Sequence, residues 1–444
     1  MKRVLMISYI FPPFNGSGAQ RPFYFAKHLP EFGYRPIVVT AEKCTISDVD
    51  TKPLSELLDC CKVVSIRELR PRDWILKARG GVKALDKFSS PVTKDERWLS
   101  HFAERAHEHV RGRLWSSSHR RRSWWTLYWV IPVVTFSLKT YFQTGFDLIW
   151  ATGDPWIGLI AGYWISRLTH KPFVADIRDP WTYGVLWRPR DESEAEWLRR
   201  WEMRVLNAAT RVVYTSPLTT EVMRGRTNQR IGRKMVTITN GFADSAWDQG
   251  QVSAAEKCVF RFVGRLMNHR KPDILLRGFE LACKDPDFAK VARLEFVGDT
   301  SSFDSEIKRY SLDGRVACLG SVSQAESRQY MRNADALILL QIIDGLGNDV
   351  ISGKVYEYLA AQKPILGVVC EKGGDAWLMR TTGAGVITGI EDPNRVAQGF
   401  RHYWELWKDN KLATAVSDCD ISRFSRRNLT QDLAELFEQI LNHR

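Results

Sequence analysis

Short apolar runs alternate along most of the chain with segments whose apolar residues recur at helical spacing. In the first half, runs that predict buried strands lie at 4–9, 35–40, 62–66, 146–155, 171–181, 211–215 and 235–239. Helical spacing is found between them at 22–32, 157–168, 192–209 and 217–226. Continuous apolar runs of this length are typical of parallel strands that helices cover on both faces.

A second series of the same kind begins after Ala243–Lys257, a segment rich in Gly, Ser, Gln and charge. Its strands are predicted at 259–266, 294–298, 316–320, 336–343, 365–369 and 385–388, and its helices at 273–283, 303–310, 326–332, 353–361, 393–407 and 429–441. We therefore expect Rossmann-like domains at 1–245 and 258–420, and a helix within 421–444 that packs back on the first domain. Two α/β halves joined by a linker also imply a cleft between them.

The segment Asp344–Leu366 combines a glycine-bearing loop with the start of a helix. Ser352 stands where a helix N-cap would stand, and Gly353 and Lys354 open the helix. Free backbone N–H groups and the helix dipole make such a unit suited to an anion. Glu357 lies about one turn into the helix, where its carboxylate can accept hydrogen bonds from ligand hydroxyls. The alternative is an ordinary βαβ unit whose loop only turns the chain.

Composition and charge narrow the class of protein. The 444 residues are 44% hydrophobic and 26% charged, as in soluble globular proteins, and the net charge of +13 favours anionic partners. The eight cysteines are scattered without metal spacing, so reduced thiols in a cytoplasmic protein are expected. The basic, apolar start resembles a signal peptide but lacks a cleavage site, and we interpret it as a strand. No stretch reaches the ~20 apolar residues of a spanning helix.

A basic, tryptophan-rich insertion lies at about 67–140. Between Arg67 and Trp125 it holds 15 Lys or Arg against 7 Asp or Glu, a surplus of 8. Within it, the region Arg120–Trp129 mixes arginine with tryptophan, which suits a peripheral contact with anionic membrane. The alternative is a solvated basic face over buried tryptophans. Single-stranded nucleic acid would suit the same composition, but it rests on charge alone and we do not expect it.

Polar residues cluster where several strands of the first half end. The first strand is followed by a loop with Gly16 and Gly18, which let a backbone approach a ligand closely. Later strands end in Asp154 and in Arg178 and Asp179. Ligands of open parallel sheets sit at this edge. The alternative is that Arg178 and Asp179 form a local ion pair that holds the loop.

The sequence GKVYEYLAAQKPIL at 353–366 resembles the donor-site motif of family 4 glycosyltransferases of the GT-B type. The stretches PPFNGSGAQRPFYFAKHLPEFGYRPIVVT, ADIRDPW and VTITNGF resemble the N-terminal domain of the same family. The family carries two acidic residues with seven residues between them, which here gives Asp349 and Glu357. The first is usually Glu, so Asp349 departs from the pattern by one methylene. Gly345 and Gly347 also depart from the family's glycine positions.

The resemblance implies a GT-B fold and a retaining, metal-independent hexosyl transfer from a UDP- or GDP-sugar to a glycan or lipid-linked acceptor, in cell-surface polysaccharide or glycolipid synthesis. The implied donor residues are Gly16, Gly18, Arg265, Lys271, Asp349, Ser352, Gly353, Lys354 and Glu357. Among these, Glu357 would hold the ribose, Asp349 the sugar hydroxyls, and Arg265 with Lys271 the diphosphate. Arg270 stands at the family's usual spacing, but we prefer Lys271 because a helix starts after it. Asp154, Arg178 and Asp179 would border the acceptor, and the loop with Gly16 and Gly18 would border both the acceptor and the donor sugar.

Other chemistries have weaker support in the sequence. Three D-x-D patterns, at 48–50, 285–287 and 418–420, follow no apolar strand cleanly, so we expect neither a metal nor another cofactor. Patterns for a nucleophile elbow, a P-loop or a zincin are missing. A sugar-nucleotide epimerase or hydrolase of the same fold, and a non-catalytic subunit that binds sugar or lipid, stay open. We expect a cytoplasmic protein, with the membrane contact at the inner face if it forms.

Overall fold

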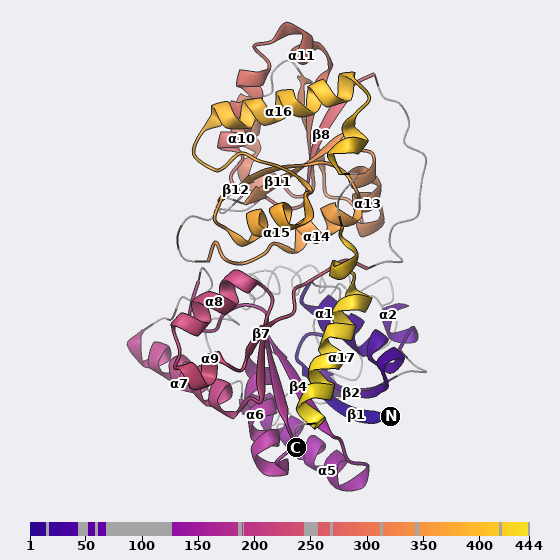
Figure 1. The fold of residues 1–444 in the computed structure, drawn as a ribbon, viewed down its shortest axis with the longest axis vertical. Coiled ribbons are helices and arrows are strands. Elements are labelled where there is room, and N and C mark those ends of the chain that lie inside the picture. Colours follow the sequence, from indigo (N-terminus) through magenta and orange to yellow (C-terminus); the bar gives the residue numbers. More distant parts are fainter. Residues whose placement is uncertain are drawn as a thin grey trace, which may run out of the picture. The chain divides into compact units, whose positions relative to one another are not determined.

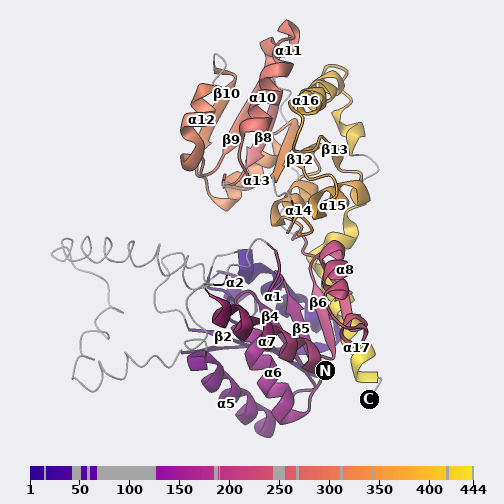
Figure 2. The same ribbon diagram turned by 90° about the vertical axis from the view of Figure 1, so that its left-hand side faces the viewer.

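The computed structural model describes residues 1–14, 17–42, 52–57, 61–67, 127–184, 189, 191–243, 256–266, 270–310, 314–341, 345, 347–416 and 420–442. Within these ranges the chain forms two sheets, of seven and six strands. Figures 1 and 2 show the two sheets with their helices. The predicted α/β class, with two Rossmann-like domains, is confirmed.

The seven-stranded sheet has the order β3-β2-β1-β4-β5-β6-β7. Its strands are β1 Lys2–Ser8, β2 Tyr34–Ala41, β3 Lys62–Ile66, β4 Leu148–Gly153, β5 Phe173–Ile177, β6 Arg211–Tyr214 and β7 Met235–Thr237. The pairs β1–β2, β2–β3, β1–β4 and β4–β5 all run parallel. Every residue of β4 and β5 is buried, as expected for strands covered on both faces.

The helices between these strands are α1 Ser17–His28, α2 Lys52–Ser55, α5 Leu127–Gln143, α6 Ile157–Thr169, α7 Glu192–Ala208, α8 Pro217–Gly225 and α9 Gln229–Gly232. In the neighbouring pairs α5–α6 and α6–α7 the helices pack against each other, and the row is visible in Figure 2. The predicted helix at 22–32 instead starts at Ser17 and ends in a 3-10 turn, Leu29–Phe32. Pro22 lies inside α1.

The six-stranded sheet has the order β10-β9-β8-β11-β12-β13. Its strands are β8 Cys258–Val263, β9 Ala292–Val297, β10 Val316–Gly320, β11 Ala336–Gln341, β12 Ile365–Val369 and β13 Gly385–Ile387. All its strand pairs run parallel. Along β11, Ile338 and Leu340 join one hydrophobic cluster while Leu337 and Leu339 join another, so the two faces of the sheet carry separate cores.

The helices of this second part are α10 Asp273–Ala282, α11 Pro286–Val291, α12 Asp304–Arg309, α13 Gln324–Arg332, α14 Gly353–Ala360, α15 Gly374–Thr382 and α16 Pro393–Lys408. They are followed by α17 Arg426–Asn442. α10 and α16 lie against each other over one core, as Figure 1 shows. The sequence did not predict α15. Its start, Gly373-Gly374, has the composition of a loop, and the structure explains the glycine: a Cβ on Gly374 would lie 2.6 Å from the carbonyl oxygen of Asp349.

Contacts between Cα atoms divide the chain into two compact units. Unit 1 comprises Met1–Thr182, Leu186–Val213 and Leu436–Arg444, and unit 2 comprises Tyr183–Val185 and Tyr214–Glu435. Within unit 1, the end of α17 packs on the first two strands, where Tyr34 Oη donates to Glu438 Oε2 at 3.1 Å. One boundary between the two units lies inside β6. The units therefore do not coincide with the two sheets and do not test the predicted domain bounds, which stay a prediction.

Most of the basic insertion at 67–140, including Trp124 and Trp125, lies outside the described residues. The described part of it consists mainly of α5. Trp129 on this helix is fully buried, its ring meets Tyr9 edge to face, and its Nε1 donates to the Ile66 carbonyl at 3.2 Å. Trp129 is therefore a core residue, and it is not available for the membrane contact that was predicted for Arg120–Trp129. No helix in the described part of the chain is long and apolar enough to span a bilayer.

Candidate functional site

The loop after β11 and the start of α14 form the centre of the candidate site in unit 2. The predicted N-cap is confirmed, because Ser352 Oγ accepts from the Lys354 backbone N–H at 3.3 Å. The Ser352 backbone N–H in turn donates to Asp375 Oδ1 at 2.7 Å. This bond joins α14 to the first turn of α15 and fixes the position of the helix N-terminus.

Lys354 extends from α14 across the carboxyl end of β8. Its Nζ donates to the Val263 carbonyl at 2.7 Å and lies 4.6 Å from the centre of the Phe262 ring. The pKa of Lys354 is lowered to about 7, mainly by burial and then by the nearby Arg270, while Glu357 opposes both effects. An anion beside Nζ would favour the charged form and raise this pKa again, so the residue is suited to an anionic ligand.

Only glycine fits at position 264, beneath the Lys354 side chain. Gly264 has φ +140°, and a Cβ there would overlap Lys354 Nζ. Gly298, at the end of β9, has φ +129°, and a Cβ there would overlap the Gly264 carbonyl oxygen. Two strand ends and a lysine side chain therefore meet at a distance that only glycine permits.

Glu357 lies one turn into α14 and is half-buried. Burial raises the pKa of its carboxyl group, while Lys354, Arg426 and Arg328 lower it. Its carboxylate accepts no hydrogen bond from the described residues, so its oxygens keep their acceptor capacity. This is the arrangement expected of a carboxylate that binds ligand hydroxyls.

Three cationic side chains flank the loop after β8, and their surroundings in the structure differ. Arg265 is exposed and forms an ion pair with Asp299, Nε to Oδ2 2.9 Å. Arg270 is partly buried, and its Nε donates to Gln341 Oε1 at the end of β11 at 3.2 Å. Burial lowers the pKa of Arg270. Lys271 is exposed, and none of the described residues forms a polar contact with it. The structure thus places Arg270 in the candidate site and points the preferred Lys271 to solvent.

The sequence did not indicate Asp375, which is buried in the first turn of α15. Its Oδ1 accepts from Ser352, whereas its buried Oδ2 has no hydrogen-bond partner among the described residues. Burial raises the pKa of Asp375 to about 7, with the Ser352 N–H and Arg270 opposing. The Gly-Gly-Asp start of a helix directly after a strand is the signal that could have identified it.

Asp349 lies in different surroundings from those expected of a residue that holds sugar hydroxyls. It is 3% exposed, and both carboxylate oxygens are engaged: Tyr183 Oη donates to Oδ1 at 3.1 Å and Thr219 Oγ1 to Oδ2 at 2.6 Å. Its carbonyl oxygen accepts from Ser216 Oγ, the N-cap of α8, at 2.5 Å. These bonds, all within unit 2, give Asp349 a structural role that the motif spacing did not predict.

In unit 1, Arg178 binds the backbone of two other residues of the predicted ligand site, Gly18 and Asp154. Its guanidinium donates to the carbonyl oxygens of Gly18 at 2.6 Å, of Gly153 at 3.2 Å and of Asp154. Arg178 therefore joins the loop after β4 to the start of α1. Asp179 is nearby in sequence, and its carbonyl oxygen accepts from Trp156 Nε1 at 3.3 Å. Gly16 lies outside the described residues.

The aspartates of the D-x-D patterns that the structure describes have local structural roles. Asp285 caps α11 by accepting from the backbone N–H of Asp287 and Phe288, and Asp420 accepts from Ser422. Asp48, Asp50 and Asp418 lie outside the described residues. In the described part of the chain, no three His, Cys, Asp or Glu residues gather as a metal site would require. Independence from metal stays a prediction.

Residues 257–405 match the family described as "Glycosyl transferases group 1". No curated protein sequence matches the chain. The matched range contains the candidate donor site, from β8 to α15.

Solved structures of similar fold cover the whole chain at low identity. A mutant of S. aureus TarM, in complex with fondaparinux, α-GlcNAc-glycerol and UDP, has a TM-score of 0.59 at 9% identity, with 100% of each chain covered. The lipopolysaccharide outer core galactosyltransferase WaaB has 0.55 at 13%, covering 99% of this chain and 100% of its own. The α,α-trehalose 6-phosphate synthase from Burkholderia multivorans has 0.58 at 12%, covering 100% and 98%.

Likeness at this identity establishes the fold, which is GT-B: two Rossmann-like parallel-sheet domains in one chain. The chain is thus a GT-B protein, and the family match in its second half supports a glycosyltransferase.

Proposed function

We propose that this protein is a retaining, metal-independent glycosyltransferase that moves a hexosyl group from a nucleotide-sugar to a glycan or lipid-linked acceptor. One observation carries the proposal. The Ser352-capped helix α14 carries Lys354 and Glu357, and Arg270 lies near Lys354. The carboxylate of Glu357 accepts no hydrogen bond from the described residues. Such a site offers positive charge for a diphosphate and an acceptor for hydroxyl groups in one place.

In the proposed reaction, the bond between the anomeric carbon and the diphosphate oxygen breaks, and its electrons leave with the diphosphate. The anomeric carbon bonds to an acceptor hydroxyl oxygen, whose proton is released. Negative charge therefore grows on the diphosphate in the transition state. Cations that are already in position stabilise this charge without reorganisation, which is the largest contribution such a site can make.

We assign the diphosphate to Arg270, Lys354 and the N-terminus of α14, with Arg265 at the exposed side. Arg270 replaces Lys271 in this proposal because Arg270 is fixed by Gln341, whereas Lys271 points to solvent. Glu357 accepts hydrogen bonds from the ribose hydroxyls. Gly353 contributes its backbone N–H at the start of the helix.

UDP is the first nucleotide to test. The TarM complex contains UDP, and so does the structure of S. aureus MnaA, a neighbour at TM-score 0.51 and 11% identity. WaaB is named a galactosyltransferase of the lipopolysaccharide outer core, which supports a role in cell-surface polysaccharide or glycolipid synthesis. On this proposal the protein acts in the cytoplasm, and Asp154, Arg178 and Gly18 border the acceptor.

The proposal is tested by incubating the protein with UDP-, GDP- and ADP-sugars, with and without glycan or glycolipid acceptors. It predicts that nucleoside diphosphate is released only when an acceptor is present, and that NMR of the product shows the anomeric configuration of the donor. Release or isomerisation without acceptor would instead indicate a hydrolase or epimerase of this fold. Failure to bind any nucleotide would indicate a non-catalytic subunit. An unchanged rate in EDTA is expected, and loss of activity there would contradict independence from metal.

A further inference from the structure

Large apolar side chains are exposed mainly on one helical layer of unit 1. Seven such side chains are exposed in the described part of the chain, and five of them lie on α5, α6 and α7. They are Ile131 at 58% exposed, Phe142 at 81%, Trp164 at 41%, Leu168 at 53% and Met203 at 38%. Because these helices pack in a row, the five exposed apolar side chains belong to one helical layer.

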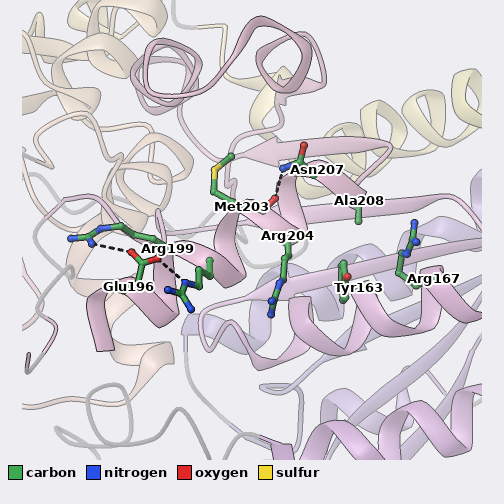
Figure 3. A pocket seen from close by; sticks show the side chains of 9 residues that line it. Tyr163, Arg167, Glu196, Arg199, Met203, Arg204, Asn207 and Ala208 are labelled. Carbon is green, nitrogen blue, oxygen red and sulfur yellow. Dashed lines mark hydrogen bonds and ion pairs between the residues drawn. The ribbon is translucent and has the colours of Figure 1, made fainter. Parts of the chain in front are cut away.

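An open groove of about 530 Å³ runs between α6 and α7 in the same layer. Tyr163 and Arg167 line it from α6, four residues apart on one helix face. The α7 residues that line it include Glu196, Arg199, Arg200, Met203 and Arg204. Figure 3 shows Tyr163, Arg167 and Arg204 close together along the groove. The ring of Tyr163, which lines the groove, contacts Trp201, and the rings of Trp164 and Trp197 contact Trp201 as well.

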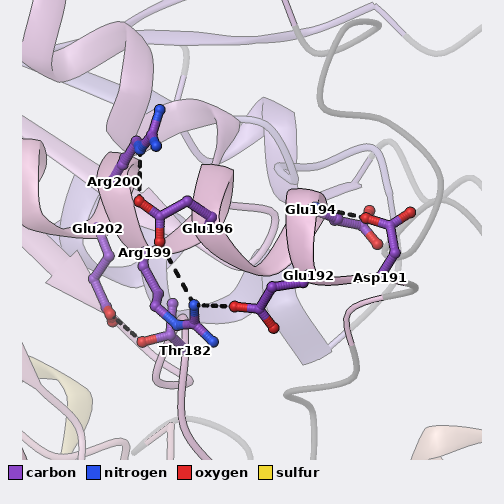
Figure 4. A network of polar contacts seen from close by, with 8 residues as sticks. All are labelled: Thr182, Asp191, Glu192, Glu194, Glu196, Arg199, Arg200 and Glu202. Atoms are coloured by element: carbon purple, nitrogen blue, oxygen red, sulfur yellow. Dashed lines mark hydrogen bonds and ion pairs between the residues drawn. The ribbon is translucent and has the colours of Figure 1, made fainter.

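The three helices carry five Lys or Arg and four Glu, but all five cations are exposed whereas two of the four Glu are buried. α5 and α6 contain no acidic residue, and Lys139 and Arg167 are exposed on them. On α7, Glu196 pairs with Arg199 at 3.6 Å and with Arg200 at 2.6 Å, as Figure 4 shows. The guanidinium of Arg204 stacks 5.1 Å from the Trp201 ring centre and stays exposed.

Glu194 and Glu202 are buried, and Glu202 accepts a hydrogen bond from Thr182, so neither adds exposed negative charge to the layer. Glu192 pairs with Arg199 at 2.7 Å. Glu196 also lines the groove, but it pairs with Arg199 and Arg200, and neither Arg167 nor Arg204 forms an ion pair with a Glu of these helices.

We propose that the layer formed by α5, α6 and α7 docks on the surface of an anionic phospholipid bilayer, with headgroup phosphates in the α6–α7 groove. Tryptophan, leucine and phenylalanine side chains beside arginines match the boundary between lipid tails and headgroups. The docking layer is distinct from the region Arg120–Trp129 and does not depend on the donor chemistry of unit 2.

Two other occupants fit the layer less well. A second copy of the chain, related by two-fold symmetry, would place the cations of one layer against those of the other. Single-stranded nucleic acid would be bound by stacking on aromatic rings, and the aliphatic side chains Ile131, Leu168 and Met203 offer no such surface.

Flotation of the full chain with vesicles tests the proposal. We expect flotation with vesicles of phosphatidylcholine and phosphatidylglycerol, and none with phosphatidylcholine alone. The double variant Arg167→Glu/Arg204→Glu should lose roughly tenfold or more in affinity, since each cation near an anionic surface contributes about 1 kcal/mol. Lys308→Glu/Arg309→Glu, which makes the same charge change at exposed positions on α12, is the matched control and should float like the wild type.

A second pair of variants tests the apolar part. Trp164→Ser/Leu168→Ser should weaken flotation, whereas Leu319→Ser, at the 40% exposed apolar position on β10, should not. Because Trp164 also packs on Trp201, a lower melting temperature is expected for its variant than for Leu319→Ser, and circular dichroism at the flotation temperature checks that both variants are folded. Full flotation by both the charge variant and the apolar variant of the layer would overturn the proposal, because another surface would then bind the membrane. Salt-sensitive binding to single-stranded DNA in place of vesicles, or a dimer that these variants dissociate, would also overturn it.

Discussion

The Nζ atom of Lys354 lies 2.7 Å from the carbonyl oxygen of Val263 and directly above the glycine that follows. This contact ties the first turn of α14 to the end of β8. Tyr358, one turn further along α14, bonds to the same residue, with its Oη 2.9 Å from the Val263 backbone nitrogen. The start of the helix is thus fixed on the sheet edge where the candidate donor site lies.

The first prediction concerns Gly264. A Cβ at this position would overlap Lys354 Nζ, and the backbone φ of +140° strains any other residue. Gly264→Ala should therefore lower the free energy of unfolding by about 1–3 kcal/mol and displace Lys354. Gly225→Ala, at the end of α8 where a Cβ meets open space, is the control and should be neutral or slightly stabilising. Urea denaturation measures both, and equal stability of the two variants would contradict the close approach.

The second prediction concerns the pH dependence of stability. Burial lowers the pKa of Lys354 from 10.5 to about 7. Between these pH values the unfolded chain binds more protons than the folded chain, so this residue makes the free energy of unfolding rise with pH. Lys354→Met should remove that rise, which is worth about 5 kcal/mol at most over the whole interval. Urea denaturation of both proteins across this pH range measures it, and parallel pH profiles would show that Lys354 is not buried as described.

The third prediction concerns Asp349. Asp349→Ala leaves the buried hydroxyls of Tyr183 and Thr219 without their acceptor, so it should lower the free energy of unfolding by about 2–3 kcal/mol. Asp349→Asn keeps an acceptor oxygen and the side-chain volume, and should cost less than about 1 kcal/mol. Chemical denaturation separates the two variants. A loss of donor binding in Asp349→Asn at unchanged stability would restore the sugar-binding role that the motif implied.

Local sequence signals predicted the fold and part of the site. Ser352 and Glu357 were identified because their places depend on the start of a single helix. Asp375 was missed because its bond to Ser352 joins two segments 23 residues apart. Asp349 received a sugar-binding role from motif spacing, whereas its contacts come from Tyr183 and Thr219, which are more than a hundred residues away in the chain. The spacing of residues along the chain does not show which distant segment contacts a given side chain.

The fourth prediction separates two adjacent cations. Arg270 is held by Gln341 in the candidate site, and Lys271 points to solvent. Arg270→Gln should weaken UDP binding roughly tenfold to a hundredfold, since a charge-assisted hydrogen bond is worth about 1.5–3 kcal/mol. Lys271→Gln removes one positive charge from the neighbouring residue and serves as the matched control, with little change expected. Titration calorimetry at fixed salt measures both, and a larger loss in Lys271→Gln would reverse the assignment.

The fifth prediction concerns Glu357, the residue on which the donor site depends. Because burial raises the pKa of its carboxyl group, the ionised side chain does not stabilise the fold at neutral pH. Glu357→Ala should therefore leave the urea midpoint unchanged or slightly raised. Glu357→Gln, which keeps one acceptor oxygen in the same place, should retain part of the binding.

The most direct measurement is the calorimetric titration of Glu357→Ala with the nucleotide-sugar that the wild-type protein binds. The account predicts that binding falls below detection while the denaturation midpoint does not fall below the wild-type value. A dissociation constant equal to that of the wild type would contradict the placement of the donor at α14.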